Sequence, residues 1–277
     1  MIVDIGVNLL SRQFQSDQDA VIERARAAGV GGMLITATDL SSTKSAIARC
    51  SSPDLFCTAG IHPHNAGSAG SANEDWLQQL ASLAQSPVVR AVGETGLDFN
   101  RNYSPVDIQI DFFRRQIELA KQINKPLFVH DRDSDGEVFK QLQLAGSLPP
   151  VVIHCFTGNA VELDRYLAAD YYIGITGWIT DPRRGTTLAE LVKKIPLHRL
   201  LIETDAPFLR PHNTPTTFIS EHNLPAKRKR RNEPALLPYV LEMIASHRPE
   251  AKTEIAAATT ANASRLFGFS LAQAVSD

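Results

Sequence analysis

Eight short apolar segments, each followed by a longer and more polar stretch, restrict the fold of this chain more than any other feature. They are rich in Val, Ile, Leu and aromatic residues and are bounded by Gly, Pro or Asp, as β-strands are. Strands that alternate with helices form a parallel sheet, and eight such units predict a (β/α)8 barrel, also called a TIM barrel. The predicted strands cover residues 2–9, 32–38, 55–62, 88–96, 126–132, 151–158, 171–177 and 200–207.

Amphipathic helices are predicted between these strands. Residues 17–29 and 107–124 place apolar side chains near helical spacing. Two further helices, near 234–247 and 251–266, follow the eighth strand, and we expect them on the outside of the barrel. A doubly wound open sheet is the alternative, but it usually has fewer strands and one ligand site at a switch point. We expect one domain over residues 1–277, because barrels of about 250 residues fold as single domains.

Composition sets the broad class of protein. The 43% hydrophobic and 21% charged residues are typical of a soluble globular protein, and the net charge of −2 gives no overall attraction to a polyanion. We find no apolar run long enough to cross a membrane and no signal peptide at the N-terminus. Cys50, Cys57 and Cys155 form no CxxC pair, so reduced thiols and a cytoplasmic location are expected.

Carboxylates and histidines gather where the predicted strands end, which is where barrels of this type have their active sites. Glu94, His130, His154 and Asp205 end the fourth, fifth, sixth and eighth strands. Imidazole and carboxylate groups together suit a divalent metal ion. We therefore predict that all four residues are metal ligands. Glu94 and Asp205 are also predicted to be catalytic, and Asp205 could accept a proton from the attacking water.

A structural role is the alternative for each histidine. Four of the eight histidines lie at strand ends, and this placement favours metal binding by His130 and His154. For His62, substrate contact and a structural role remain equally open. His64 is expected to cap or brace its loop, with Pro63 stiffening the turn. The other four are expected to be solvated or structural: His198, His212, His222 and His247.

Glu203 raises a separate question, because it lies two residues before Asp205 and therefore faces the same interior. A buried carboxylate without a partner is costly. Arg132 shares a strand face with His130, so it is a candidate partner for Glu203 or, alternatively, a ligand for a substrate phosphate. We include Arg132 among the predicted substrate-binding residues.

Basic residues follow the seventh and eighth strands, on the predicted active-site rim. They are DPRR (181–184), Arg210 and the run AKRKRRNEP (226–234). One such run is commonly just solvated, but several on one rim favour a nucleic acid or another phosphorylated substrate. Arg231 is the predicted substrate contact from the long run, which could also form one wall of the pocket. Trp178 and Phe208 could stack on bases, although core packing is the default for either residue.

A set of motifs resembles the TatD-type metal-dependent deoxyribonucleases, in the order of that family and over nearly the whole chain. The motifs are AGIHPH, GETGLDF, PLFVHDRD, VIHCFTG, IGITGW, LLIETDAPFL and RRNEP. The resemblance implies a TIM barrel that hydrolyses phosphodiester bonds with a divalent metal. In family terms Glu94, His130, His154 and Asp205 match metal ligands, and His62 matches a substrate-contacting position.

The first strand departs from the family pattern. Most members carry a His-x-His pair that helps to hold one of two metals, whereas this chain has Gly6 and Asn8. Glycine offers no ligand atom, and an amide oxygen suits Mg²⁺ better than Zn²⁺. We therefore expect one tightly held metal or two loosely held ones, Mg²⁺ first, with Mn²⁺ or Zn²⁺ as alternatives. Gly6 is expected to leave space for water or substrate, and Asp4 needs a hydrogen-bond partner.

The motif DIGVNL resembles the branch of the family associated with 3′–5′ exonuclease action on single-stranded DNA and RNA. The prediction is thus a cytoplasmic, monomeric, Mg²⁺-dependent exonuclease that acts on DNA, with RNA as a second substrate and no membrane partner. One rival is a hydrolase of an ester or amide bond, such as a D-aminoacyl-tRNA deacylase. Another is a nucleic-acid-binding protein that has lost catalysis, which the missing histidine pair motivates.

Overall fold

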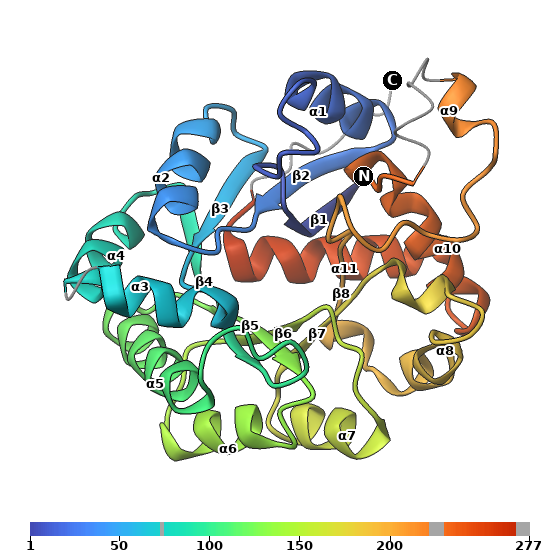
Figure 1. Cartoon of the computed structure of the whole chain (residues 1–277). Coiled ribbons are helices and arrows are strands. Elements are labelled where there is room, and N and C mark those ends of the chain that lie inside the picture. Colours follow the sequence, from blue (N-terminus) through green and yellow to red (C-terminus); the bar gives the residue numbers. More distant parts are fainter. Residues whose placement is uncertain (73–74, 222–229, 270–277) are drawn as a thin grey trace.

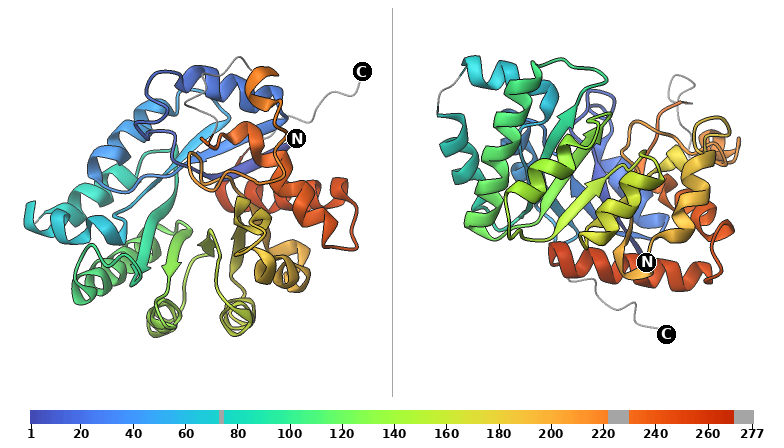
Figure 2. Two further views of the ribbon diagram at one scale, coloured as in Figure 1. Left: turned by 45° about the vertical axis from the view of Figure 1, so that its right-hand side comes forward. Right: turned by 90° about the horizontal axis from the view of Figure 1, so that it is seen from below.

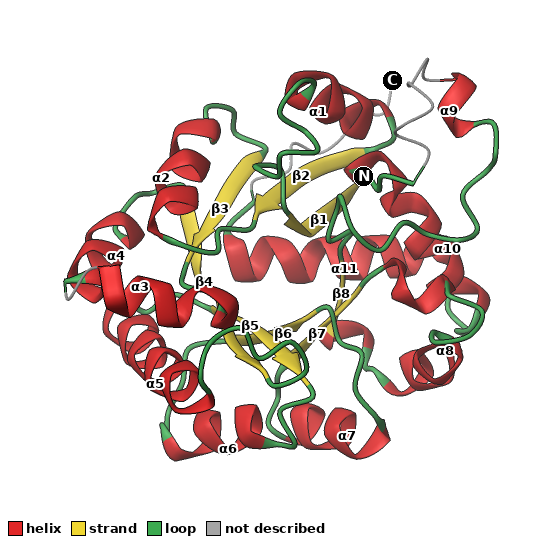
Figure 3. Cartoon of the chain, viewed as in Figure 1, coloured by secondary structure: helices red, strands yellow, loops and turns green. Residues whose placement is uncertain are grey.

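A computed structural model, which describes residues 1–72, 75–221 and 230–269, confirms the predicted barrel (Figure 1). Eight parallel strands form one sheet in the order β1 to β8, with helices around it (Figure 3). The strands are β1 (Ile2–Val7), β2 (Val30–Ile35), β3 (Leu55–Ala59), β4 (Val89–Asp98), β5 (Leu127–Arg132), β6 (Val151–His154), β7 (Tyr172–Ile175) and β8 (Leu200–Ile202).

The helices follow the predicted alternation with the strands. Those before β8 are α1 (Gln18–Ala27), α2 (Leu40–Arg49), α3 (Ala66–Ala72), α4 (Trp76–Ala84), α5 (Val106–Ile123), α6 (Glu137–Leu144), α7 (Ala160–Ala168) and α8 (Thr186–Leu191). After β8 come α9 (Phe218–Glu221), α10 (Leu237–Ser246) and α11 (Lys252–Phe267). Short 3-10 helices include η1 (Pro63–Asn65), η2 (Gly177–Thr180) and η6 (Pro234–Leu236).

Local sequence signals explain where several helices begin and end. Asp39 and Asn159 open α2 and α7 with capping boxes, in which each side chain accepts a hydrogen bond from the backbone amide three residues on. The amphipathic helix α5 buries Phe112 and Phe113 against the sheet and ends at Asn124, whose φ of 50° an Asn side chain tolerates. The predicted helices 17–29 and 107–124 are thus α1 and α5, shifted only at their ends.

Four strands, β2, β3, β6 and β8, end three to five residues before their predicted ends. The segments 151–158 and 200–207 continue past the strand ends as loops that are buried or partly buried. The backbone leaves the sheet at Cys155 and Asp205, whose φ values are 47° and 52°. His62 likewise lies after β3, where its side chain caps η1. These loops carry the polar side chains of the rim.

The barrel closes between β1 and the chain that follows β8. Val7 pairs with Ala206 in a parallel bridge, and the Asp205 amide donates to the Gly6 carbonyl at 2.8 Å. The Asn8 amide donates to Ala206 O, also at 2.8 Å. Closure therefore brings the polar positions of β1 beside the Glu-Thr-Asp sequence after β8.

The interior of the barrel is a hydrophobic core that α11 covers at one end. Inward-facing residues such as Ile5, Leu34 and Phe128 pack together with Leu266 and Phe267 of α11. Figure 2 shows α11 lying across the end of the barrel where the strands begin. The expectation that both C-terminal helices pack outside is therefore wrong for α11, because its apolar face closes the N-terminal opening. Among the residues described, no helix is long and apolar enough to cross a membrane.

Candidate metal centre

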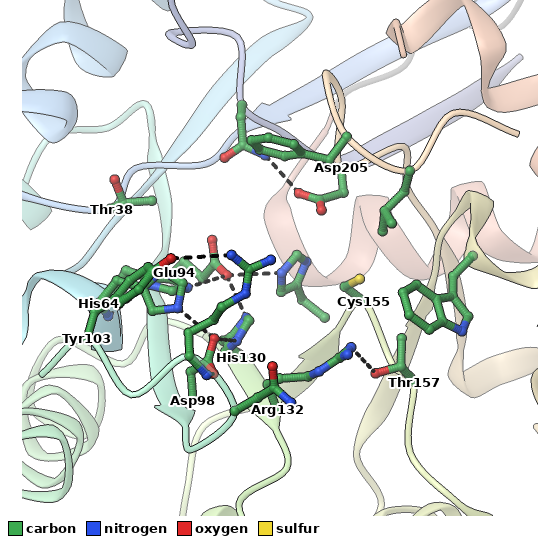
Figure 4. A pocket seen from close by; sticks show the side chains of 18 of the residues that line it. Thr38, His64, Glu94, Asp98, Tyr103, His130, Arg132, Cys155, Thr157 and Asp205 are labelled. Atoms are coloured by element: carbon green, nitrogen blue, oxygen red, sulfur yellow. Dashed lines mark hydrogen bonds and ion pairs between the residues drawn. The ribbon is translucent and has the colours of Figure 1, made fainter. Parts of the chain in front are cut away.

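A cavity of about 640 Å³ opens at the C-terminal ends of the strands. Loops after seven of the eight strands line it, and Figure 4 shows the polar side chains that point into it. Of the seven residues predicted for the site, six lie in this cavity. They are His62, Glu94, His130, Arg132, His154 and Asp205.

Three imidazole rings converge on one carboxylate oxygen. Oε1 of Glu94 lies 3.2 Å from Nε2 of His62, 3.0 Å from Nδ1 of His130 and 3.1 Å from Nε2 of His154. Glu94 and His154 are almost completely buried. Ligand atoms of His62, Glu94 and His130 lie within 4.8 Å of one another, close enough to share one metal ion. Four strands therefore bring donor atoms to a single point.

The bonding of His154 indicates that a cation belongs at this point. Its Nδ1 lies 2.9 Å from Oε2 of Glu203, and a carboxylate there requires a hydrogen on Nδ1. In the neutral ring Nε2 then carries a lone pair, which faces the lone pairs of Glu94 Oε1 at 3.1 Å. Only a proton or a metal ion between the two atoms removes this repulsion. A carboxylate behind a histidine is also a common way to orient a metal ligand.

The charges around Glu94 and His154 lead to the same conclusion. Burial alone would lower the pKa of His154, but Glu203 and Glu94 raise it well above its ordinary value. Burial would raise the pKa of Glu94, yet His62 and His154 lower it well below the usual range. The two carboxylates thus favour positive charge between them. A divalent ion at this position would meet that demand as well as a proton does.

Glu203 finds its partners in β6 rather than in Arg132. Besides the His154 ring, the backbone amide of Cys155 donates to its Oε1 at 2.6 Å. The predicted ion pair between Arg132 and Glu203 is therefore wrong. Sequence could not reveal this choice, because it depends on which neighbouring strand approaches the carboxylate. Arg132 remains in the cavity, where its Nη1 donates to Thr157 Oγ1 at 3.3 Å.

His62 is bonded in a way that makes it a hydrogen-bond donor. Its Nδ1 accepts a hydrogen bond from the His64 backbone amide at 3.1 Å, so the neutral ring carries its hydrogen on Nε2. That hydrogen points at Glu94. Burial lowers the pKa of His62 to about 4 despite the attraction of Glu94, so the ring is neutral near pH 7. His62 therefore fits a polar contact better than a metal ligand.

Asp98 is a site residue that sequence reasoning missed. Its Oδ2 lies 2.6 Å from Nε2 of His64 and 3.4 Å from Nε2 of His130. Burial would lower the pKa of His130, but Asp98 and Glu94 outweigh this effect and raise it to about 9. Asp98 follows Glu94 by four residues on the same strand, so period-two spacing could have placed both on one face. The ring of His64 braces its loop through Asp98, as predicted.

Asp4 and Gly6 of β1 both face residues that follow β8. Asp4 accepts hydrogen bonds from the Thr204 amide at 2.9 Å and from its hydroxyl at 2.5 Å, which supplies the partner that the sequence required. A Cβ added at Gly6 would lie 2.2 Å from Oε2 of Glu203, and one at Gly174 would lie 2.4 Å from Oε1. The expected open space at Gly6 is therefore wrong, because the Glu203 carboxylate fills it.

Asn8, the residue that follows β1, holds the side chain of Asp205. Its Nδ2 donates to Oδ1 of Asp205 at 2.7 Å, so the side chain contacts the predicted ligand directly. Burial raises the pKa of Asp205 to about 7, with Glu94 and Glu203 adding to the rise and His154 opposing it. Asp205 lines the same cavity as Glu94. The amide of Asn8 thus contacts the cavity through the neighbouring carboxylate of Asp205.

Aromatic and cationic side chains form the outer wall of the cavity. The guanidinium carbons of Arg132 and Arg184 lie 5.3 Å and 4.3 Å from the centre of the Trp178 ring. Phe208 and Tyr103 also line the cavity, with 52% and 65% of their surfaces exposed. Core packing, the default expectation for Phe208, is therefore wrong. These rings offer flat surfaces next to positive charge.

Arg231 does not join the other predicted residues. Only 5% of it is exposed, and its Nη2 contacts Oδ2 of Asp17 at 2.8 Å and Oε1 of Glu233 at 2.5 Å. Its Nη1 donates to the carbonyl oxygen of Gln13 at 2.7 Å. The guanidinium is thus committed to buried partners outside the cavity, and the substrate contact predicted for it is corrected. Arg230 is exposed, whereas residues 222–229, which include His222, Lys227, Arg228 and Lys229 and most of the proposed pocket wall, lie outside the described residues.

A (β/α)8 barrel with three histidines and several carboxylates on its C-terminal rim defines the class of metal-dependent hydrolases. The family model described as "TatD related DNase" matches residues 3–268, and the chain belongs to this family of hydrolases. The structure of YJJV, a TatD homolog from Escherichia coli K12, has a TM-score of 0.83 and 28% identity, and the match covers 96% of this chain and 98% of that one. A TatD family hydrolase from Entamoeba histolytica has a TM-score of 0.83 and 26% identity, with 96% and 97% covered.

Two similar proteins carry a more specific name. The "3′-5′ ssDNA/RNA exonuclease TatD" of Citrobacter rodentium is 44% identical over 273 residues, which are 98% of this chain and 99% of that protein. The protein of the same name from Escherichia fergusonii is 44% identical over 270 residues, which are 96% and 99% of the two chains.

Proposed function

We propose that this protein is a metal-dependent 3′–5′ exonuclease that hydrolyses single-stranded DNA and RNA. The observation that carries the chemistry is the convergence of three imidazole nitrogens on Oε1 of Glu94. Substrate and polarity are taken from relatives of that name, which are 44% identical over nearly the full length. Free cysteines at positions 50, 57 and 155 support a cytoplasmic location, and a monomer is the simplest assembly.

The metal is proposed to be held by Glu94, His130, His154 and Asp205. The donor set of imidazole and carboxylate groups fits a divalent ion, with Mg²⁺ first and Mn²⁺ or Zn²⁺ as alternatives. When bound, such an ion would lower the pKa of a water molecule and neutralise charge on the scissile phosphate. Glu203 fixes the tautomer of His154, so that its Nε2 faces the site as an acceptor.

The remaining steps fall to side chains of this chain. Asn8 holds Oδ1 of Asp205, and Oδ2 is then the atom that accepts the proton of the attacking water. Neutral His62 keeps its Nε2 hydrogen toward Glu94 in the absence of substrate, and it can turn that hydrogen to a phosphate oxygen when a strand binds. Each of these groups lies within the same cavity.

The strand itself is proposed to lie along the outer wall. Arg132 and Arg184 would contact phosphates, while Trp178 and Phe208 would stack on bases. Base stacking of this kind tolerates any sequence, as a degradative exonuclease requires. The cationic contacts predict that binding weakens as the salt concentration rises.

The test is a nuclease assay on single strands labelled at the 5′ end, run with Mg²⁺, Mn²⁺, Zn²⁺ or EDTA. The wild type should produce ladders that shorten from the 3′ end only when metal is present. Glu94→Ala should lose activity by roughly a hundredfold or more. Glu118→Ala, which alters an exposed carboxylate of α5, is the matched control and should remain active. Equal digestion by wild type and Glu94→Ala, or by wild type in EDTA, would contradict the proposal.

A further inference from the structure

Asn232 contacts the loop that carries Asp205 at three backbone atoms. Its Nδ2 donates to the carbonyl oxygens of Thr204, at 2.9 Å, and Phe208, at 2.7 Å, and its own amide donates to Pro207 O at 3.1 Å. The side chain is fully buried. From these contacts we propose that Asn232 is a positioning residue, which fixes Asp205 in the conformation that binds the metal. The inference rests on the function proposed above.

The loop needs such support because of its backbone conformation. Asp205 and Leu209 both have φ values of 52°. This left-handed region of the backbone is unfavourable for residues other than glycine. β8 has already ended at Ile202, and β1 holds the following segment through the Asp205 amide and the Ala206 carbonyl, which precede Pro207 and Phe208. The two carbonyls bound by the Asn232 side chain belong to residues on either side of Asp205. One amide group therefore spans the segment that aims the carboxylate.

Asn232 is itself fixed to the barrel wall by its two neighbours. Arg231 contacts Asp17 at 2.8 Å, and Glu233 contacts Arg24 of α1 at 2.7 Å. Both contacts are largely buried. The backbone amide of Glu233 also donates to Oδ1 of Asn232 at 2.9 Å, which fixes the orientation of the side-chain amide. The motif RNE thus links α1 to the Asp205 loop, and this link accounts for a basic residue that does not face the cavity.

A matched control lies at the other end of β8. Asn262 of α11 is also buried, and its Nδ2 donates to the carbonyl oxygens of Leu197 and Leu200 at 2.8 Å and 2.9 Å. Replacing either asparagine with alanine removes two side-chain hydrogen bonds to backbone carbonyls. We therefore expect similar losses in Tm from the two variants. Of these two asparagines, Asn232 is the one that contacts the loop of a proposed metal ligand.

The test is the affinity of the full-length chain for Mn²⁺, measured by isothermal titration calorimetry. Asn232→Ala should raise the Kd about tenfold or more, as the loss of groups that orient metal ligands does, and Asn262→Ala should leave it within about twofold. In an Asp205→Asn background, Asn232→Ala should cause no further rise, because the ligand that it positions is already lost. Equal Kd values in wild type and Asn232→Ala, or equal rises in both asparagine variants, would overturn the inference.

Two outcomes separate this inference from the proposed function. A wild-type chain that binds no Mn²⁺ would overturn both together. A wild-type chain that binds Mn²⁺ as tightly as Asn232→Ala does would overturn only the role of Asn232. If Asn232→Ala does not fold, Asn232→Ser keeps one hydrogen-bond donor and should raise the Kd by a smaller factor. An unchanged Kd in Asn232→Ser would then count against the inference.

Discussion

The carboxylate of Glu203 occupies the space that a side chain at position 6 would need. A Cβ at Gly6 would lie 2.2 Å from its Oε2, the same oxygen that lies 2.9 Å from the His154 ring. Position 6 is the first of the two positions, Gly6 and Asn8, at which the sequence departs from the His-x-His pattern expected from the family resemblance. In this chain the Glu203 carboxylate fills the space beside Gly6 and orients His154, a proposed metal ligand. β1 therefore supports the site at position 6 without supplying a ligand there.

Gly6→Ala should therefore weaken metal binding through Glu203. The added methyl group forces the buried carboxylate away from His154, and loss of such an orienting group typically costs about 10–100-fold in metal affinity. Overpacking should also cost about 1–3 kcal/mol of unfolding free energy. Calorimetric Kd values for Mn²⁺ and urea unfolding measure the two effects. Gly67→Ala is the control, because a Cβ there meets only ordinary contacts at 3.4 Å or more. A Gly6→Ala protein with wild-type metal affinity would show that Glu203 does not orient His154.

Arg132→Ala should impair substrate binding more than stability. The side chain is one-third exposed, and its contacts to Thr157 at 3.3 Å and Asp133 at 3.6 Å are long. Loss of one phosphate contact should raise KM for a single strand about tenfold and reduce the salt dependence of binding. Steady-state kinetics at several salt concentrations, with Tm as a second readout, test this expectation. Arg115→Ala on the outer face of α5 is the control. A fully active Arg132→Ala enzyme would remove this residue from the substrate site.

Arg231→Met should reduce stability more than substrate binding, which is the reverse of the effect expected for Arg132→Ala. The guanidinium is buried between Asp17 and Glu233, and its removal leaves Arg24 as the arginine that these two largely buried carboxylates share. Breaking a buried ion pair in this way costs roughly 3–5 kcal/mol. Urea unfolding measures this loss, and KM should change little in the protein that remains folded. A large rise in KM with normal stability would restore the substrate contact that the sequence predicts.

The sequence is enough to predict the barrel and the convergence of the main site residues, because both follow from local patterns. Apolar runs mark all eight strands, and the rule that strand ends meet on one rim brings Glu94, His130 and His154 together. The partners of individual buried side chains, in contrast, do not follow from local patterns. Arg231 lies 214 residues from Asp17, and no local pattern shows that the two side chains are buried together.

The same limit applies to α11 and to Glu203. An amphipathic pattern shows that α11 buries one face, but the apolar opening that it covers exists only once the barrel has closed. Likewise, the position of Glu203 shows that it faces inward, whereas its partner is decided by the distance between β6 and β8. Long-range geometry thus determines the features that were predicted wrongly.

Titration of Asp4 should lower the free energy of unfolding as the pH rises toward neutrality. Burial raises its pKa from 3.8 to about 7, because hydrogen bonds from Thr204 and Gly6 only partly offset the loss of solvation. The folded state therefore binds a proton that the unfolded state releases between these two pH values. Its contribution to unfolding free energy is greatest below pH 4 and declines by at most about 1.4 kcal/mol per pH unit up to pH 7.

Asp4→Asn isolates this effect, since an amide resembles the neutral acid. Its Oδ1 can still accept from the Thr204 and Gly6 amides, and its Nδ2 can donate to the Thr204 hydroxyl oxygen. Urea unfolding at pH 5, 6, 7 and 8 should show the wild type losing stability relative to Asp4→Asn up to about pH 7 and then levelling off. Taking the difference between the two proteins cancels the titration of groups that they share. A constant difference across this range would mean that Asp4 is already ionised in the folded protein at pH 5.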